Sequence, residues 1–545
     1  MTSRTIGRTI GVPSLSPGSF PGFGEDAPLD LHGLTDAGAA ALVRRFRDRT
    51  MGAFTDAAAS VHYCTRPIQL AGSSQTVDTR TGEILSSYSS TDAPLGVTLV
   101  PCGNRRASEC PACARTYARD TFELIRAGAV GGKTVPDTVA VNPMLFVTLT
   151  APSFGHVHRA PKPGQPVVRC RPRDTAKVCE HGRPIGCMAS HDASDALVGQ
   201  PICPDCYDYQ GHVVWQWWAP ELWRRFTIAL SRRLARALGV TETRRRPTKR
   251  RPIPPPALCD VASVQYAKVA EYQTRGLIHF HGLIRLDGPK TPNGFAPATE
   301  SVPVQLLAAL VEEAAASVTH TAPSPVPGSR DRVLRFGQQL DVRVVRSAHR
   351  PDDEEAHGLA GEDVERVAGY LAKYATKAVS DTTDRQGGHG ATWNAHYGRL
   401  RAECRRLAAH SELRAREARE SGNHDYVDPY VLIGKWAHML GFRGHFSSKS
   451  RRYSVTLGRL RRARRRWQAL AAESARTGEP VDTADLERRL MSEDEDETTL
   501  VIGDWSYVGT GWQNSGEAAL ADAAAARARE YAQWRAEHKH RSQNH

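Results

Sequence analysis

The sequence lacks the features that mark several large classes of protein. It has no stretch of about 18 consecutive apolar residues, and its N-terminus has no apolar core of signal-peptide length, which argues against a membrane span or secretion. It also lacks a nucleotide-binding loop, a helicase motif and an internal repeat of fixed period. Acidic residues are outnumbered: 59 Asp and Glu stand against 72 Lys and Arg, a net charge of +13 in 545 residues. We therefore expect a cytoplasmic protein with an anionic partner, although a generally basic proteome would give the same charge.

Eleven cysteines are present, and in a reducing compartment they are expected to be free or metal-bound rather than paired in disulfides. Two sets share a Cys-x₇-Cys and a Cys-x₂-Cys spacing, which predicts two structural Zn²⁺ ions, each held by four thiolates. The first set is Cys64, Cys102, Cys110 and Cys113, and the second is Cys179, Cys187, Cys203 and Cys206. Cys170, His181 and His191 are alternative ligands for the second set. Cys259 and Cys404 are isolated and are expected to be ordinary apolar residues.

The motif His279-Phe280-His281 lies in an apolar run that predicts a β-strand. Side chains alternate along a strand, so the two imidazoles share one face and Phe280 takes the other. Burying two uncompensated imidazoles is costly, which favours a ligand for them over ordinary packing. Glu271, across a predicted hairpin, is the nearest carboxylate. Two neutral imidazoles and a carboxylate suit Mg²⁺ or Mn²⁺ when a substrate phosphate completes the coordination.

A second motif places Tyr370 and Tyr374 one turn apart on a predicted helix, residues 362–379. Lys373 and Lys377 lie within a turn of both phenols and would favour the phenolate, since an unperturbed phenol has a pKa near about 10. Aromatics at this spacing are also common in ordinary cores. Together with a metal that polarises a phosphate, the phenols predict a DNA transesterification that leaves a 5′-phosphotyrosyl link and a free 3′-hydroxyl.

These motifs resemble a known superfamily. Residues 146–150, the histidine pair and the tyrosine motif follow the order of the three motifs of HUH endonucleases, and the tyrosine spacing is similar to that of phage rolling-circle initiators. More closely, the chain resembles the replication initiator proteins of actinobacterial plasmids and integrative conjugative elements. That resemblance covers residues 60–540 and rests also on residues 102–106, 110–113, 203–209, 271–276, 436–442 and 450–455.

The resemblance implies an α+β fold. Its centre would be an HUH-nuclease antiparallel sheet of five strands with flanking helices, the histidines on a central strand and the tyrosine helix across it. Zinc-bound cysteine-rich insertions and a helical basic C-terminal region would complete the chain. In single-tyrosine relatives the nucleophile corresponds to Tyr374, so Tyr374 would act first and Tyr370 second.

The predicted organisation is linear. Residues 1–35 form a flexible arm, 36–140 a region with the first zinc site, 141–380 the nuclease domain with a cysteine-rich insertion at about 155–257, and 400–545 the C-terminal region. Strands are expected at residues 145–150, 261–272, 277–286 and 340–345. Helices are expected at residues 39–49, 215–238 and 304–317.

Residues 441–467 contain nine Arg and one Lys but no Asp or Glu, with aromatic residues interleaved. Basic side chains neutralise phosphates and aromatic rings stack on unpaired bases, so this segment predicts DNA contact, although a solvated helix face would show the same charge. The candidate DNA-binding residues are Arg443, Lys449, Arg451, Arg452 and Tyr453.

The predicted function is that of a rolling-circle replication initiator. It would bind an origin, nick one strand as a metal-dependent, site-specific single-strand endonuclease, and rejoin it. A host helicase is an expected partner, because the chain has no helicase motif of its own. Two alternatives remain: a relaxase or transposase that uses the same chemistry, and a zinc-containing DNA-binding regulator without catalysis.

Overall fold

The structure is a computed structural model that describes most of the chain. It describes residues 35–93, 95–107, 109–161, 166–173, 177–247, 253–291, 294–346, 367–369, 371, 391–492, 499–523, 525–526, 530 and 534. The chain divides into two compact units: the first combines Met1–Asp120 with Thr456–His545, and the second is Thr121–Val455. This differs from the predicted linear series, because parts of the expected N-terminal and C-terminal regions share one unit.

The first unit is built on an antiparallel sheet that joins segments far apart in the sequence. Strand β1 (Ile68–Asp78) pairs with β13 (Thr499–Thr510) along its whole length, and with β2 (Ile84–Ser89) and β3 (Thr98–Val100). Its helices include α1 (Asp36–Arg47), α2 (Met51–Ser60), the 3₁₀ helix η2 (Ser90–Asp92), the start of α3 (Pro111–Val130), α9 (Leu457–Thr477) and α10 (Leu486–Met491), and residues 515–523 are also helical. The predicted helical character of residues 400–545 therefore does not extend to β13, which is rich in β-branched and aromatic residues.

The second unit contains a five-stranded antiparallel sheet with the histidine strand at its centre. The strand order is β11-β4-β6-β5-β12, and each neighbouring pair is antiparallel. The bounds are β4 (Met144–Leu149), β5 (Ser263–Tyr272), β6 (Ile278–Asp287), β11 (Leu340–Arg346) and β12 (Ser447–Lys449). The strand number and the central position of β6 agree with the sheet that the sequence resemblance implies.

The other elements of this unit surround the sheet. They are the 3₁₀ helices η3 (Asp137–Val141), η4 (Leu258–Asp260) and η5 (Ile433–Met439), the helices α4 (Tyr209–Ala237), α5 (Val304–Ser317) and α8 (Ala391–Glu420), and the short strands β7 (Lys290–Thr291), β8 (Gly294–Phe295), β9 (Thr319–Ala322) and β10 (Arg332–Arg335). Helix α5 has the predicted bounds. Helix α4 begins six residues before the prediction because the Asp208 carboxylate caps it, accepting a hydrogen bond from the Gly211 amide at 2.7 Å.

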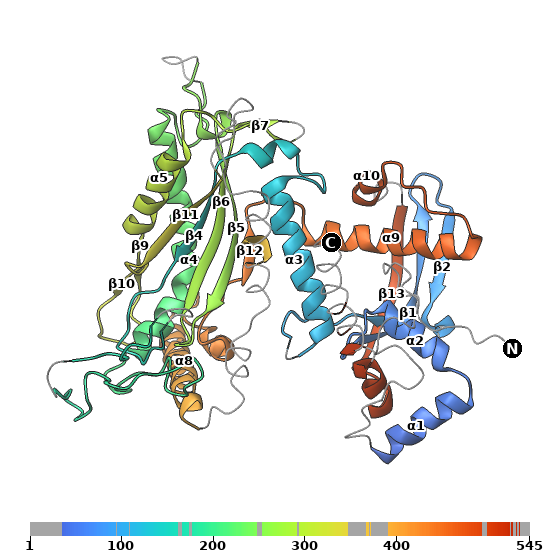
Figure 1. Cartoon of the computed structure of the whole chain (residues 1–545), viewed down its shortest axis with the longest axis horizontal. Helices are drawn as coiled ribbons and strands as arrows, with labels where there is room; N and C mark the ends of the chain where they lie inside the picture. The colour runs from blue at the N-terminus through green and yellow to red at the C-terminus, as the bar shows by residue number, and fades with distance from the viewer. Residues whose placement is uncertain are drawn as a thin grey trace. The chain divides into compact units, whose positions relative to one another are not determined.

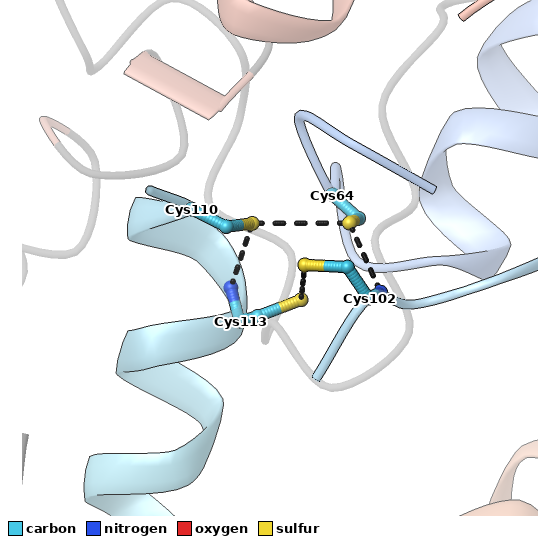
Figure 2. A group of neighbouring side chains, drawn as sticks. All are labelled: Cys64, Cys102, Cys110 and Cys113. Atoms are coloured by element: carbon cyan, nitrogen blue, oxygen red, sulfur yellow. Dashed lines mark hydrogen bonds between the residues drawn. The ribbon is translucent and has the colours of Figure 1, made fainter. Parts of the chain in front are cut away.

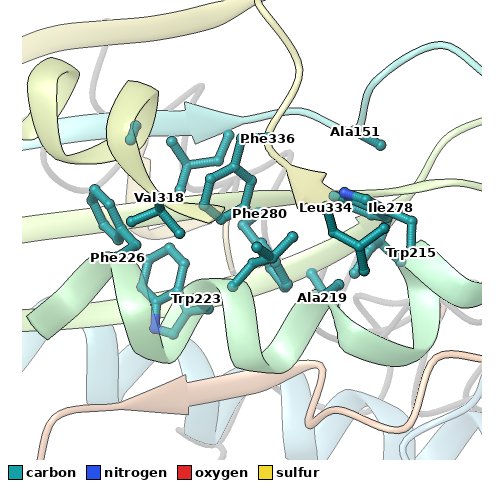
Figure 3. Close-up of a cluster of buried hydrophobic side chains, with 14 of the residues drawn as sticks. Ala151, Trp215, Ala219, Trp223, Phe226, Ile278, Phe280, Val318, Leu334 and Phe336 are labelled. Carbon is teal, nitrogen blue, oxygen red and sulfur yellow. The ribbon is translucent and has the colours of Figure 1, made fainter. Parts of the chain in front are cut away.

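One face of the sheet packs against α4 and α5 (Figure 1), and this layer holds the main core of the second unit. Figure 3 shows Phe280 of β6 facing Trp223 and Phe226 of α4, with the Phe280 and Trp223 rings edge to face at 5.5 Å. Phe280 and Phe226 are fully buried. The predicted alternation along β6 is therefore confirmed: Phe280 belongs to the core face, which leaves the histidines on the other.

The opposite face carries a buried ion pair, farther along β6 from the histidines. Arg285 makes two hydrogen bonds to Asp287, at 2.7 and 2.8 Å, and both side chains are fully buried. Arg285 also donates to the Gly128 carbonyl of α3, and Asn142 donates to Asp287 at 2.7 Å. The guanidinium lies 5.2 Å from the centre of the Tyr453 ring. These contacts place the later residues of α3 on the histidine face of the sheet.

Within the described residues, no helix has both the length and the apolar character that crossing a bilayer requires.

Asp287→Asn should destabilise the second unit strongly, because it leaves the buried Arg285 charge uncompensated. Breaking such a pair costs about 3–5 kcal/mol, and we expect the urea midpoint of the α4 tryptophan fluorescence to fall accordingly. The matched control is Glu242→Gln, which removes an exposed pair with Arg232 and should cost less than about 1 kcal/mol. Equal midpoints for the two variants would contradict this account of the buried pair.

Candidate functional site

The candidate site lies on the β5–β6 hairpin. Antiparallel pairing sets Glu271 opposite His279 and Val269 opposite His281, so all four residues occupy one face of the sheet. The sequence did not show on which face of the sheet Glu271 lies. The strand register places it on the same face as the histidines. The predicted hairpin turn is also present: the amide of Gln273 donates to the carbonyl of Leu277 at 2.8 Å, and Gly276 adopts a φ of +80°.

His281 is held by residues from both neighbouring strands. Its Nε2 lies 2.9 Å from a Glu271 carboxylate oxygen, and its Nδ1 lies 3.1 Å from the Thr148 hydroxyl on β4. Its ring stacks on Phe146, with the ring centres 5.8 Å apart. A hydroxyl can donate or accept, so Thr148 suits either tautomer of the imidazole. When Nε2 serves as a metal ligand, the Nδ1–H can donate to Thr148, the usual support for a metal-bound histidine.

His279 has a different environment from His281. Its Nε2 is buried and has no hydrogen-bond partner among the residues that the structure describes. Burial, with smaller contributions from Arg275 and His281, lowers the pKa of His279 to about 3. The ring is therefore neutral at pH 7 and retains a free lone pair. The two histidine ring centres lie 6.4 Å apart.

These residues fit a hard divalent cation in donor type. The unpartnered His279 nitrogen, His281 and the Glu271 carboxylate supply two imidazole nitrogens and one oxygen ligand. Three protein ligands would leave coordination positions for the oxygens of a substrate. The donor atoms of the three residues do not all lie within 4.8 Å of one another.

Buried side chains hold the hairpin turn that precedes His279. The Thr274 carbonyl accepts from the Tyr397 hydroxyl at 3.0 Å, the Arg275 carbonyl from His396 Nε2 at 3.2 Å, and the Gly276 carbonyl from Gln216 at 3.0 Å. Gln216 also accepts from the Ile278 amide at 3.0 Å. Thr148, Gln216 and His396 were missed by sequence reasoning, because nothing in their local sequence signals these long-range contacts.

The predicted nucleophiles Tyr370 and Tyr374, with Lys373 and Lys377, lie outside the described residues, so their placement stays a prediction. Residues 367–369 and 371 are helical, and Ala368 and Leu371 are fully buried. This short stretch agrees with the helix predicted for residues 362–379.

The first predicted cysteine set is brought together in the first unit (Figure 2). The Sγ atoms of Cys64 and Cys110 lie 3.8 Å apart, and those of Cys102 and Cys113 lie 3.7 Å apart. All four sulfurs fall within 4.8 Å of one another. Zn–S bonds of about 2.3 Å in a tetrahedron separate two sulfurs by about 3.8 Å, so the arrangement has zinc-site dimensions rather than those of disulfides. Hydrogen bonds from Cys113 and Cys64 lower the pKa of the Cys110 thiol.

The second predicted set is corrected in one member. Cys179, Cys203 and Cys206 group with His181, not with Cys187, and His181 Nδ1 lies 3.3 Å from the Cys206 sulfur. Cys187 belongs to a separate third group, which is His158, Cys170, Cys187 and His191. Sequence spacing gave the wrong grouping because Cys179 and Cys187, the two ends of the Cys-x₇-Cys, belong to different groups. His181 is one of the alternatives that the sequence left open, whereas His158 was missed.

Three of the four aromatic residues of the basic segment are buried and do not have the role predicted for them, whereas Trp467 is half-buried. Tyr453 is fully buried, its hydroxyl donates to the Ile125 carbonyl at 3.1 Å, and its ring lies against Gly128 of α3, where a β-carbon would clash. Phe442 and Phe446 belong to the main core. Tyr453 therefore cannot stack on a base, and its assignment to DNA binding is wrong.

The basic residues predicted to bind DNA differ in how accessible they are to an anion in solution. Lys449 is half-buried and donates to the Ser454 carbonyl at 2.8 Å, and burial lowers its pKa. The Arg443 guanidinium lies 4.3 Å from the centre of the Trp217 ring. Arg443 is nevertheless exposed, as are Arg451 and Arg452. Of the five predicted residues, these three arginines are the best placed to meet a solvent-borne anion.

Comparison with known proteins gives a consistent result. The family model described as RepSA, replication initiator protein of pSAM2, matches residues 50–526. A protein of Streptomyces ambofaciens named replication initiator protein is 39% identical over 463 residues, which cover 84% of this chain and 85% of that protein. No solved structure matches the chain.

We expect each of the first two cysteine groups to bind one zinc ion that can be lost independently of the other. Cys110→Ser and Cys206→Ser should each remove one equivalent, because each breaks one four-ligand set. Native mass spectrometry of the intact chain measures the loss. Cys259→Ser is the matched control, because Cys259 is exposed and lies outside all three groups. Unchanged zinc content in Cys110→Ser would remove the first site.

Proposed function

The chain belongs to the RepSA family of replication initiator proteins, and we propose that it starts rolling-circle replication by nicking one strand at an origin and later rejoining it. The proposal includes binding to origin DNA on a plasmid or integrative conjugative element. It also includes a host helicase as the partner that unwinds the duplex.

The observation that carries the proposal is the histidine pair on the central strand. His279 and His281 lie beside Glu271 on a rigid sheet, with Thr148 supporting His281 and an unpartnered nitrogen on His279. A Mg²⁺ or Mn²⁺ ion held by these three side chains would polarise a phosphodiester and offset the charge that develops in the transition state. The chain's own contribution is to hold two imidazoles and a carboxylate at fixed positions on the sheet.

A tyrosine of the predicted helix would supply the nucleophile. The Oη of Tyr374 forms a bond to phosphorus while the bond from phosphorus to the 3′ oxygen breaks. The phenol proton is lost, and the leaving oxygen takes up a proton to become a 3′-hydroxyl. One phosphodiester is exchanged for another, so the reverse step needs no nucleotide cofactor. Lys373 and Lys377, within one turn on a helix, would favour the phenolate.

Tyr370 would provide the second nucleophile. After one round, the 5′ end remains bound to the first tyrosine, and cutting the regenerated origin needs another phenol. A spacing of four residues on a helix gives both phenols access to one phosphate.

Exposed basic residues would hold the DNA backbone. Arg451 and Arg452 are exposed and follow β12 in sequence, and β12 pairs with β5 of the histidine sheet. Their contacts would be to phosphates, which position a strand without reading its sequence.

The family favours an initiator over a relaxase or transposase, which would use the same chemistry on another element. A regulator without catalysis would leave the support of His281 by Glu271 and Thr148 without a purpose.

His279→Ala and His281→Ala should each lower nicking of supercoiled origin DNA by about 100-fold or more, because each removes a metal ligand. Duplex binding in a gel-shift assay should be retained. Thr148→Val should lose about tenfold, because it removes only the support of His281. His424→Ala, an exposed histidine away from the sheet, is the control. Wild-type nicking by either ligand variant in metal-depleted buffer would refute the assigned role.

Tyr374→Phe should abolish the first covalent adduct on a single-stranded origin oligonucleotide, because the attacking oxygen is gone. Tyr370→Phe should form that adduct but fail in termination. The adduct is detected on a denaturing gel and its residue mapped by peptide mass spectrometry, with the exposed Tyr507→Phe as control. Mapping to Tyr370 alone would reverse the order of the two phenols. An undiminished adduct in the double variant would rule out the tyrosine mechanism.

A further inference from the structure

The third donor group lies in the segment between β4 and α4. Its members come from four short stretches: His158, Cys170, Cys187 and His191. His158 Nδ1 lies 3.2 Å from His191 Nε2, and the Cys187 sulfur lies 3.3 Å from the same nitrogen. The Cys170 sulfur lies 3.9 Å from His158 Nδ1. In a tetrahedral zinc site two nitrogens lie about 3.4 Å apart and a nitrogen and a sulfur about 3.6 Å apart, so these distances bracket the expected values.

The surroundings of the group orient its donors inward. His191 Nδ1 lies 2.6 Å from an Asp195 carboxylate oxygen, and the other Asp195 oxygen accepts from the Leu197 amide at 2.8 Å. A carboxylate on one ring nitrogen fixes the proton there and directs the lone pair of the other nitrogen toward a metal. The Arg159 amide donates to the Cys170 sulfur at 3.2 Å, which helps to hold that sulfur in place. His191 and Cys170 are almost fully buried.

The segment has little else to hold it together. Its described residues between β4 and α4 form no helix or ladder of strands, only four isolated β-bridges. Most side chains in residues 166–173 and 177–190 are exposed or half-buried. Two of the bridges involve ligands of the group, His158 with Val198 and Arg171 with Cys187. A fold without an apolar core needs cross-links, and metal binding supplies them.

The group also connects to the hairpin turn before His279. The His158 amide donates to the Gln200 carbonyl at 2.8 Å, and the Gly199 amide donates to the His158 carbonyl at 2.9 Å. Gly199 has a φ of +90° and lies so close to Thr274 that a β-carbon would be 2.8 Å from the Thr274 backbone. The stretch paired with His158 therefore packs directly on the turn.

We propose that His158, Cys170, Cys187 and His191 bind a third structural Zn²⁺, which holds the segment between β4 and α4 against the turn of the β5–β6 hairpin. Two thiolates and two imidazoles in a closed tetrahedron are a typical structural zinc set. Asp195 is a positioning residue, because it acts through His191. The proposal concerns metal content and stands apart from the nicking chemistry.

The test is zinc content of the full-length chain, purified without chelator and measured by elemental analysis. We expect three equivalents in the wild type, two in Cys187→Ser and in Cys170→Ser, and three in Cys259→Ser. The double variant Cys187→Ser/Cys206→Ser should retain one, because the substitutions affect different groups. Wild-type zinc content in both Cys187→Ser and Cys170→Ser would overturn the proposal.

A milder variant covers the case in which the cysteine variants fail to fold. Asp195→Asn keeps all four ligands. Loss of a residue that supports a ligand typically weakens metal binding by about 10–100-fold. One of three equivalents should therefore pass to a competing chelator at about 10–100-fold lower chelator concentration than in the wild type. Release curves identical to wild type would overturn the proposal. Trypsin cleavage within residues 160–190 should accelerate in step with the loss of that equivalent.

Discussion

The antiparallel register between β5 and β6 is the constraint on which the candidate site depends. Pairing Glu271 with His279 and Val269 with His281 decides that two imidazoles and a carboxylate share one face. A shift of one residue would turn the histidines into the core and Phe280 out of it. The contacts of Phe280 with Trp223 and the rest of the core prevent that shift. The apolar layer on one face therefore specifies the polar site on the other.

The turn of the hairpin is fixed just as firmly. Three successive carbonyls, from Thr274 to Gly276, accept hydrogen bonds from buried side chains on α4 and α8. A fully satisfied buried polar network is rigid, and one missing partner would leave a carbonyl desolvated. These bonds lie within five residues of His279, so helices distant in sequence determine the position of a candidate ligand.

The sequence predicts local features of this fold well and long-range ones poorly. The hairpin, α5 and the first cysteine set follow from alternation, helical periodicity and spacing, and all appear in the structure. The pairing of β1 with β13 does not follow, because no local signal specifies a partner more than 400 residues away. Cys187 was assigned to the wrong group because the spacing of cysteines in the sequence does not reveal which segments of the chain meet in space. Tyr453 among arginines suggested base stacking, but Gly128 on α3 leaves room for its ring in the interior.

Two kinds of metal chemistry would have to coexist in one chain. The Cys-containing groups gather soft donors within 4.8 Å, which favours zinc. His279, His281 and Glu271 would also bind zinc more tightly than magnesium if affinity alone decided, since imidazole ligands follow the Irving–Williams order. If the histidine pair holds Mg²⁺ or Mn²⁺ as proposed, its selectivity would have to come from metal availability and from a set of only three protein ligands, which suits a cation that completes its shell with substrate oxygens. A strong chelator would strip both kinds of site, so loss of nicking after chelation cannot by itself distinguish a catalytic cation from a structural one. Restoring activity with Mg²⁺ or Mn²⁺ in a chain that has kept its zinc is the observation that separates them.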